Sequence, residues 1–362
     1  MTWMRRTLAL ALTALTGNPH RNIHFDPAKP HHTPTGFRNR YPHGRPSADD
    51  LRRWRAERKA HNLPPPPTTD LSAIAPHLDF IHQRHDAPAV TWIGHNTLLL
   101  QVAGLNILTD PVFSERCSPV PFAGPKRHQP PGVALAELPH IDLVLISHNH
   151  YDHLDHASVM ALSRQAGGPP TFAVALGMDA WMKRKLPHLP AERLIYLDWW
   201  ETAQAGKATL TFVPVQHWSA RTPLDRNATL WGAWVLEVDG FRFFFSGDLG
   251  YSKDIGDIAE RFDGFDFAAI GVGAYEPRWF MQNQHVNPEE SVRIHRELRS
   301  RLSMGIHWGT FELTDEPLDQ PRADLAIACE EQGLAPGEFF VLRHGETREL
   351  HGAKLEVPPS EI

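Results

Sequence analysis

The stretch LVLISHNHYDHLDH, residues Leu143–His156, is the part of the sequence that decides the fold. Its apolar first half predicts a short buried strand, which ends abruptly in histidines and aspartates. The cluster has the internal order His-x-His-x-Asp-His, in which His148 and His150 stand two residues apart and can point the same way. Asp152 and His153 follow, and neutral imidazole and carboxylate are good ligands for zinc and similar metals. We therefore predict that this loop binds metal.

Three further apolar strands each deliver one ligand-type side chain at their carboxyl-terminal end. The predicted strands TFVPVQHW, FFFSGD and SMGIHW terminate at or near His217, Asp248 and His307, respectively. A lone histidine at such a position is more often a hydrogen-bonded core or surface residue than a ligand. A series of three such residues, following the His-x-His-x-Asp-His motif, favours a dinuclear metal site.

Coordination chemistry indicates how these ligands would divide between two cations. One set would be His148, His150 and His217, the other Asp152, His153 and His307, with Asp248 bridging both cations through its two oxygens. Two metals about 4 Å apart can hold a shared water, lower its pKa and aim it at an electrophile. The same ions stabilise negative charge in the transition state. The pattern therefore predicts hydrolysis by a metal-bound hydroxide, with no protein nucleophile.

Composition limits the class of protein. The chain has 362 residues, 41% of them hydrophobic, which suffices for one large domain or two smaller ones with a sizeable core. A net charge of −6 argues against a nucleic-acid partner, because proteins that bind phosphate backbones are usually basic. The two cysteines, Cys117 and Cys329, stand far apart, which argues against a disulfide framework and a cysteine-rich zinc finger.

We divide the chain into an N-terminal arm, residues 1–86, and a catalytic domain, residues 87–362. In residues 1–17, two arginines precede an apolar run too short to span a bilayer. This pattern is typical of a secretory signal and equally of a frayed or interfacial helix, so the compartment stays open. Within the arm, residues 47–63 predict a helix capped by Ser47, and the prolines that follow stop it.

The catalytic domain is predicted to begin with strands and to be mixed in its second half. A turn at Ala103–Gly104 separates two of the first strands, and an Asp239–Gly240 hairpin joins two later ones. Helices are predicted over residues 156–165, 287–300 and 321–333. In the second of these, early proline and glutamates and late arginines suit the helix dipole.

The motif His-x-His-x-Asp-His, followed by a distant His, Asp and His, resembles the signature of the metallo-β-lactamase superfamily. This resemblance implies an α/β (α+β) fold, an αββα sandwich with the metals at one edge between two sheets. It indicates the fold and the metal more strongly than the substrate, because members of the superfamily cleave lactams, thioesters, lactones, RNA and lipids.

The flanking residues narrow the resemblance. The blocks TWIGHNT, LTDPVFSERCSPVPFAGPKR, QHWSARTPLDRNATLWGAW and SMGIHWGTFELTDEP resemble the family of phospholipases D that hydrolyse N-acylphosphatidylethanolamine. The likeness extends from about Thr91 to Glu346, whereas the first 85 residues match only loosely, at GFRNRYP. It implies cleavage of a phospholipid phosphodiester to phosphatidic acid and an N-acylethanolamine, at a peripheral membrane surface. It also implies two Zn²⁺ per chain and a homodimer.

The same resemblance implies catalytic roles for Asp248, His285 and Tyr151, the last two near the substrate phosphate. Tyr151 lies within the ligand loop and could donate a hydrogen bond to a phosphoryl oxygen. His285 precedes a predicted helix start, a place that favours anions. Considered without the family, His285 is more often a structural residue than a site residue.

Weaker candidates surround these residues. Gln284 is a neighbour of His285, and His95 either supports a ligand or is simply a hydrogen-bonded core histidine. Arg221 and Arg278 are potential anion contacts, although surface arginines are usually only solvated.

A lipid substrate requires an apolar approach to the site. In residues 177–190, Trp181 and Met182 precede three basic residues, which suits an interfacial helix, although an ordinary helix with a solvated basic face explains the pattern better. The remaining tryptophans considered are predicted to be core residues: Trp199, Trp200, Trp218, Trp231 and Trp234.

Two alternative functions remain open. One is a hydrolase of the same fold that acts on another lipid phosphodiester, an ester or a lactone. The other is a metal-binding scaffold without catalysis, against which the complete set of ligands argues. The native metal and the acyl-chain preference are also open.

Overall fold

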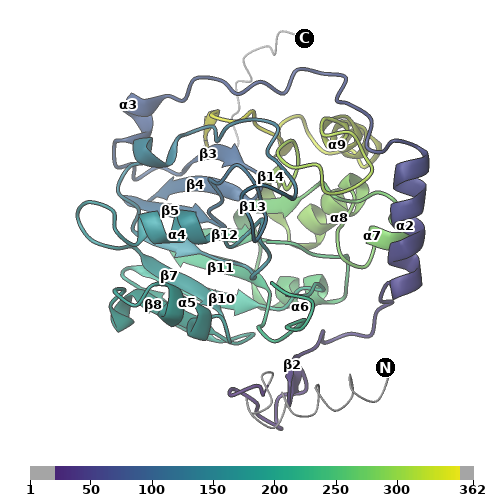
Figure 1. Ribbon diagram of the computed structural model, residues 1–362. Helices are drawn as coiled ribbons and strands as arrows, with labels where there is room; N and C mark the ends of the chain where they lie inside the picture. Colours follow the sequence, from purple (N-terminus) through teal and green to yellow (C-terminus); the bar gives the residue numbers. More distant parts are fainter. Residues whose placement is uncertain (1–20, 351–362) are drawn as a thin grey trace.

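A computed structural model describes residues 21–350 of the chain. Two seven-stranded sheets pack face to face, with helices on both outer surfaces (Figure 1). The strand orders are β16-β3-β4-β5-β6-β7-β8 in one sheet and β15-β14-β13-β12-β11-β10-β9 in the other. The predicted αββα sandwich is therefore confirmed. The segment predicted to resemble a signal, residues 1–17, lies outside the described residues.

The first sheet combines an antiparallel and a parallel half. Its strands are β3 (Ala89–Gly94), β4 (Thr97–Val102), β5 (Leu105–Thr109), β6 (Leu143–Leu145), β7 (Thr171–Ala175), β8 (Leu194–Leu197) and β16 (Thr347–Glu349). The predicted turn at Ala103–Gly104 joins β4 to β5, with positive φ angles of 52° and 70°. A second tight reversal, at His95 and Asn96, was not predicted, and it points two polar residues toward the edge where the metal ligands gather.

The second sheet repeats this division. Its strands are β9 (Thr202–Ala205), β10 (Ala208–Val213), β11 (Ala233–Val238), β12 (Phe241–Phe245), β13 (Phe265–Gly271), β14 (Ser300–Ile306) and β15 (Phe339–Phe340). The predicted Asp239–Gly240 hairpin joins β11 to β12, with positive φ angles of 47° and 82°. Strands β12 to β15 are parallel. Because parallel strands end at the same edge of a sheet, the loops that follow β12 and β14 start close together.

Large side chains from both sheets fill the space between them. Trp92, Trp234 and Phe243 are fully buried, and burial of each side chain of this size contributes roughly 1.5–3 kcal/mol. The Trp234 indole Nε1 donates to the backbone oxygen of Ile146 at 3.0 Å and so ties the second sheet to the end of β6. Trp199, Trp231 and Trp234 are core residues as predicted.

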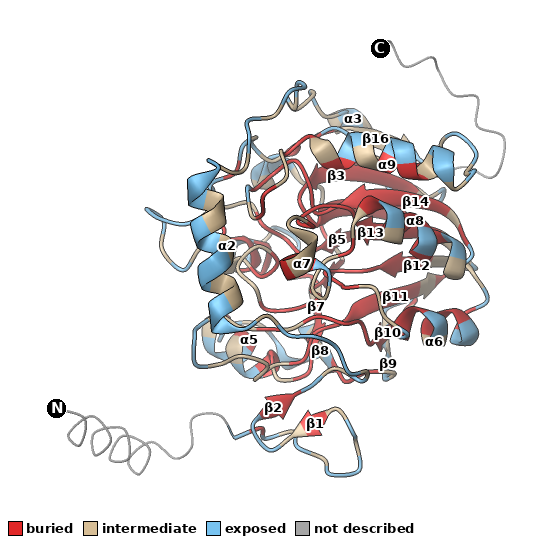
Figure 2. Ribbon diagram, turned by 90° about the vertical axis from the view of Figure 1, so that its right-hand side faces the viewer, coloured by how far each residue is buried: buried red, intermediate tan, exposed pale blue. Residues whose placement is uncertain are grey.

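Helices cover the two outer faces of the sandwich. Helices α3 (Leu78–Ile81), α4 (His156–Leu162) and α5 (Asp179–Lys185) lie on the side of the first sheet, and α6 (Asp254–Arg261), α8 (Pro288–Glu297) and α9 (Gln320–Glu331) on the side of the second (Figures 1 and 2). Shorter elements are η1 (Leu135–Glu137), η2 (Ala191–Arg193) and α7 (Arg278–Met281). The predicted helices over residues 156–165, 287–300 and 321–333 correspond to α4, α8 and α9.

Part of the predicted arm packs on the outside of the sandwich. It contains β1 (His32–Thr33), β2 (Gly36–Phe37) and α2 (Ala48–Ala60), which has the predicted capping box between Ser47 and Asp50. None of the residues of α2 is buried, but Trp54 stacks on Phe280 with ring centroids 4.9 Å apart. The domain boundary at residue 86 stays a prediction. Within residues 21–350, every helix is too short or too polar to cross a bilayer.

Candidate metal centre

The seven predicted ligands lie in loops at one edge of the sandwich. The loop with His148–His153 connects β6 to α4, and His307 follows the last residue of β14 directly. Strands β10 and β12 end earlier than predicted, at Val213 and Phe245, so His217 and Asp248 lie in loops beyond the strand ends. These loops converge from distant parts of the sequence.

One group of ligand atoms surrounds one oxygen of Asp248. The ligand atoms of His148, His150, His217 and Asp248 all lie within 4.8 Å of one another. His148 Nε2 is 2.8 Å from His150 Nδ1, and the Nε2 atoms of His148 and His217 are 3.8 Å and 3.6 Å from Asp248 Oδ2. This spacing suits ligands that share one cation.

A second group lies on the other side of Asp248. His307 Nε2 is 3.2 Å from Asp248 Oδ1 and 3.6 Å from Asp152 Oδ2. His153 Nε2 is 3.4 Å from Asp152 Oδ2 and 3.1 Å from Asp248 Oδ2. Asp248 therefore lies between the two groups, with Oδ1 toward His307 and Oδ2 toward His148, His217 and His153, and its bridging role stays a prediction.

Unpaired nitrogens test whether this set fits a metal. The Nε2 atoms of His153, His217 and His307 are buried and make no hydrogen bond in the described part of the protein, although oxygens of Asp248 lie 3.1 Å, 3.6 Å and 3.2 Å away, respectively. A buried polar atom without a partner costs about 1–3 kcal/mol. Cations at this position would give all three atoms a partner, so the residues fit a metal centre of imidazole and carboxylate ligands.

The opposite ring nitrogens of two of these histidines, His153 and His217, do have partners. His153 Nδ1 lies 2.6 Å from Asp110 Oδ2, and His217 Nδ1 lies 3.0 Å from the backbone oxygen of Gln284. Such contacts fix the ring and leave Nε2 free for a metal. Gln284, a weaker candidate from the sequence, thus contacts a predicted ligand through its backbone.

Sequence reasoning missed two residues at this centre. Asp110 is fully buried and also accepts hydrogen bonds from the backbone nitrogen and the hydroxyl of Ser147, at 2.7 Å and 2.6 Å. Asn96 Nδ2 lies 3.3 Å from Asp248 Oδ1. Asp110 directly follows the last residue of β5, so the rule that found Asp248, a carboxylate just beyond an apolar strand, could also have found Asp110.

His95 supports the second group. Its Nε2 lies 3.0 Å from Asp152 Oδ2, and its side chain is buried. Burial, and the neighbouring His307, lower the pKa of His95 to about 3, so its ring is neutral and can donate one N–H to the carboxylate. Of the two interpretations left open by the sequence, contact with a predicted ligand is therefore the better description.

The electrostatics of the cluster favour added positive charge. Burial opposes ionisation of Asp248, but His153 and His307 outweigh it and hold the pKa of Asp248 well below 3.8. Burial lowers the pKa of His307, but Asp248 and Asp152 raise it to about 9. Without a cation, the buried carboxylates thus draw protons onto these histidines, and a bound cation would replace those protons.

His285 lies at the opening of the cluster. Its Nδ1 is 4.0 Å from Asp248 Oδ2, and its ring centroid is 5.1 Å from that of His307 and 5.3 Å from that of His217. Burial lowers its pKa to about 4, so the ring is neutral near pH 7. Arg278 donates to the backbone oxygen of His285 at 2.9 Å and is paired with Glu290, so it supports His285 rather than offering a free cation.

Tyr151 occupies a neighbouring position on the outside of the ligand loop. The Arg221 guanidinium lies 3.9 Å from the centroid of its ring. Both residues line a pocket of about 330 Å³ with Trp181 and Arg184, and none of the seven predicted ligands lines this pocket. Arg221 also donates to the backbone oxygen of Asn149, within the ligand loop, at 2.9 Å and to that of Leu154, directly after it, at 2.8 Å. A catalytic role for Tyr151 stays a prediction.

The predictions about two apolar residues have different outcomes. Met182 is fully buried against the core, because α5 turns this face inward, which agrees with the ordinary helix that the sequence favoured over a lipid contact. Trp218 is only half-buried, and its ring lies 4.2 Å from that of His150, at the rim of the metal centre rather than in the core.

Known proteins of similar sequence identify the family of this chain. Residues 105–308 match the model of the beta-lactamase superfamily domain. The chain is 42% identical over 245 residues to an uncharacterized protein of Mycobacterium tuberculosis, and the match covers 67% of this chain and 64% of that protein. The chain thus spans less than two thirds of the length of this relative.

Two named relatives are phospholipases. The chain is 38% identical over 264 residues to the N-acyl-phosphatidylethanolamine-hydrolyzing phospholipase D 1 of Caenorhabditis elegans, covering 71% of this chain and 74% of that protein. It is 36% identical over 251 residues to the mitochondrial enzyme of the same name from Saccharomyces cerevisiae, covering 67% of this chain and 52% of that protein.

Solved structures support the fold alone. An isothiocyanate hydrolase from Delia radicum gut bacteria matches with a TM-score of 0.54 and 20% identity, covering 72% of this chain and 98% of that one. A metallo hydrolase from Ignicoccus hospitalis matches with a TM-score of 0.52 and 19% identity, covering 72% and 97%. The chain belongs to the metallo-β-lactamase superfamily and, within it, to the family of metal-dependent hydrolases that includes the N-acyl-phosphatidylethanolamine-hydrolyzing phospholipase D 1 of Caenorhabditis elegans.

Proposed function

We propose that the protein is a zinc-dependent phosphodiesterase that hydrolyses N-acylphosphatidylethanolamine to phosphatidic acid and an N-acylethanolamine. One observation carries this proposal. Asp248 presents one oxygen to His307 and the other to His148 and His217, in a chain that is 38% identical to a phospholipase D of this specificity. A site with two ligand groups about a single carboxylate suits attack on a phosphodiester.

The two ligand groups would hold the ions. One Zn²⁺ would be held by His148, His150 and His217, the other by Asp152, His153 and His307, with Asp248 between them. Bound there, the ions would supply Lewis acidity and a water whose pKa is lowered toward neutrality.

The chain's own residues would orient the ligands and the substrate. Asp110 and His95 hold the rings and carboxylates of the second group by hydrogen bonds of 2.6 Å and 3.0 Å. His285 is neutral near pH 7 and could donate an N–H to a non-bridging phosphoryl oxygen without adding charge to the site. No side chain needs to act as a nucleophile.

Exposure indicates the direction of substrate entry. The side chains of His148, His217 and His307 are each 1% exposed, whereas those of Asp152 and His285 are 15% and 18% exposed. The centre therefore opens past Asp152 and His285, and a phosphate head group would enter from that side. We extend the proposal to a peripheral contact with the lipid surface and, on the family resemblance, to a homodimer.

Product analysis tests this function. The purified, zinc-loaded protein is incubated with a mixed phospholipid extract, and the products are identified by mass spectrometry, with Asp248→Asn as the control. Release of N-acylethanolamine together with phosphatidic acid, absent with the control, supports the proposal. Hydrolysis of a different lipid phosphodiester, ester or lactone favours the alternative substrate class, and bound zinc without any turnover favours a scaffold.

A further inference from the structure

A segment of the N-terminal arm lies against the loop that carries His217. Its first anchor is Asp198, whose carboxylate lies 2.6 Å from His31 Nε2 and 2.8 Å from His32 Nε2. Lys29 Nζ donates to the same carboxylate at 2.6 Å. Although His31, His32 and Asp198 have the composition of a metal site, the Lys29 ammonium already supplies the positive charge there. This cluster therefore fastens the arm to the sandwich.

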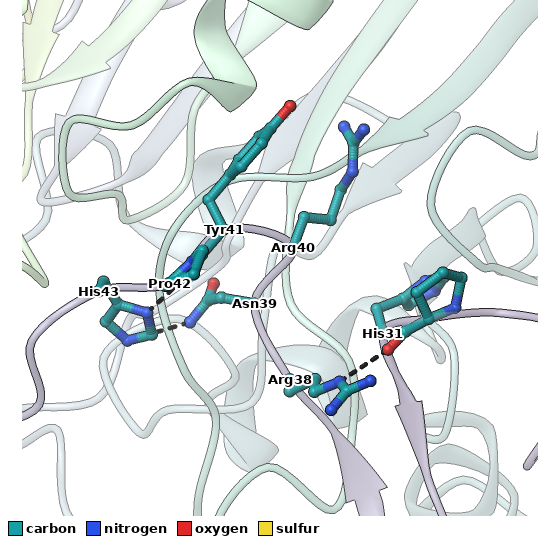
Figure 3. A pocket seen from close by; sticks show the side chains of 8 residues that line it. His31, Arg38, Asn39, Arg40, Tyr41, Pro42 and His43 are labelled. Carbon is teal, nitrogen blue, oxygen red and sulfur yellow. Dashed lines mark hydrogen bonds between the residues drawn. The ribbon is translucent and has the colours of Figure 1, made fainter.

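A second anchor of the arm is formed by Arg40 and Tyr41. The guanidinium of Arg40 and the hydroxyl of Tyr41 both donate to Asp257 Oδ2 in α6, at 2.7 Å and 2.8 Å. Asn39 lies between the two anchors. Figure 3 shows it beside Arg40, with its side chain turned toward His43, along a surface pocket of about 580 Å³.

Asn39 binds both backbone groups of His217. Its Oδ1 accepts from the His217 backbone nitrogen at 3.1 Å, and its Nδ2 donates to the His217 backbone oxygen at 2.8 Å. The side-chain amide of Asn39 thus pairs with both backbone groups of His217, as the backbone of a neighbouring strand would. The other ring nitrogen of His217 is paired with Gln284, so its backbone and its Nδ1 are both fixed, and Nε2 points at the cluster.

The position of His217 in the chain explains why it needs this support. Strand β10 ends at Val213, four residues earlier. Gln216 still pairs with Gly250, but the backbone groups of His217 itself bond to Asn39 instead of a strand. The ligands His148 and His153, by contrast, belong to a single loop between β6 and α4 that Arg221 braces from outside.

We propose that Asn39 is a positioning residue that holds His217 in place for the cation bound by His148, His150 and His217. The inference rests on the proposed function only in that a cation is bound there, and it holds for any substrate. Loss of the contacts that orient a ligand typically weakens metal affinity about 10- to 100-fold. The second group does not depend on Asn39, because Asp110 and His95 orient it.

Three variants test the proposal. Asn39→Ala removes both hydrogen bonds to His217, and the milder Asn39→Ser leaves one hydroxyl that can satisfy only one of the two groups. Arg40→Ala is the matched control, because it removes one of the two hydrogen bonds between the arm and Asp257 while sparing Asn39. Zinc stoichiometry and affinity are measured by competition with a chromogenic chelator, and the visible spectrum of the cobalt-substituted protein reports the ligand field of each site. Thermal unfolding of the zinc-free proteins is recorded alongside.

The expected result separates the two sites. Asn39→Ala weakens one zinc equivalent about 10- to 100-fold, leaves the other at wild-type affinity and changes only part of the cobalt spectrum. Asn39→Ser weakens the same zinc equivalent to a smaller extent. If Asn39→Ala does not fold, the zinc affinity of Asn39→Ser tests the positioning role instead. Arg40→Ala binds both equivalents as the wild type does.

Other results overturn the inference. Wild-type affinity and an unchanged spectrum in both Asn39 variants would exclude a positioning role. If Asn39→Ala and Arg40→Ala lose zinc affinity equally, and in proportion to their loss of thermal stability, then Asn39 only attaches the arm to the sandwich and does not position His217. A wild-type protein that binds two zinc ions but hydrolyses no lipid refutes the proposed function alone, whereas one that binds no cation refutes both.

Discussion

Asp110 offers the sharpest test of how the metal centre is held. Its carboxylate is fully buried and contacts His153 Nδ1 at 2.6 Å, on the side of the ring away from the proposed cation. In Asp110→Asn, the amide oxygen can keep the bond from the Ser147 backbone nitrogen, but the amide nitrogen must then face His153. His153 Nδ1 would have to accept, which moves its proton to Nε2, the atom that should bind metal.

The size of the effect follows from these contacts. A hydrogen bond to a charged group contributes about 1.5–3 kcal/mol. Each 1.4 kcal/mol is a factor of about ten in a binding constant, so zinc affinity should fall about 10- to 100-fold. The loss should fall mainly on the group of Asp152, His153 and His307, because Asp110 contacts His153 directly and reaches His148 only through the Ser147 hydroxyl.

Chelator competition on purified Asp110→Asn measures this loss directly. Asp142→Asn is a suitable control, since Asp142 also accepts a backbone N–H, from Asn106 at 2.8 Å, but lies outside the metal centre. We expect one weakened zinc equivalent in Asp110→Asn and none in the control. If Asp110→Asn binds both zinc ions as tightly as the wild type, the tautomer argument is wrong.

Three further predictions concern the centre and the arm. Asp248→Asn should lose bound zinc and all turnover, and full zinc content with full activity would refute the bridging role. His285→Ala should lower kcat about 10²-fold with unchanged zinc content, as is typical when one donor to a developing charge is removed, and unchanged kinetics would remove His285 from the site. Burial opposes ionisation of Asp198, but His31 and Lys29 hold its pKa below 3.8, so the stability it contributes is present above about pH 4 and lost on further acidification. The free energy of unfolding of Asp198→Asn, measured in urea at pH 7, should therefore be about 3 kcal/mol lower than that of the wild type. This difference should shrink below pH 4, and a difference that stays constant at all pH values would contradict the prediction.

Local patterns made much of the fold predictable. The hairpin at Asp239–Gly240, the cap of α2 at Ser47 and the early proline of α8 depend on neighbouring residues, and each forms as expected. The ligand motif could be recognised for the same reason, since the residues of His-x-His-x-Asp-His lie in one loop. The other three predicted ligands could be identified because each follows an apolar strand within a few residues.

Contacts between distant segments were not predictable in this way. Asn39 and His217 are 178 residues apart, and nothing in either neighbourhood specifies their pairing. Asn96 lies in a two-residue reversal that looks like continuous strand in the sequence, because the residues on both sides are apolar.

The most direct measurement is the anomalous scattering of crystals of the zinc-loaded protein, recorded at the zinc absorption edge. We expect two peaks about 3.5–4 Å apart, with Asp248 between them and the Nε2 atoms of His217 and His307 about 2.0–2.1 Å from one peak each. A single peak, or peaks remote from Asp248, would contradict this expectation.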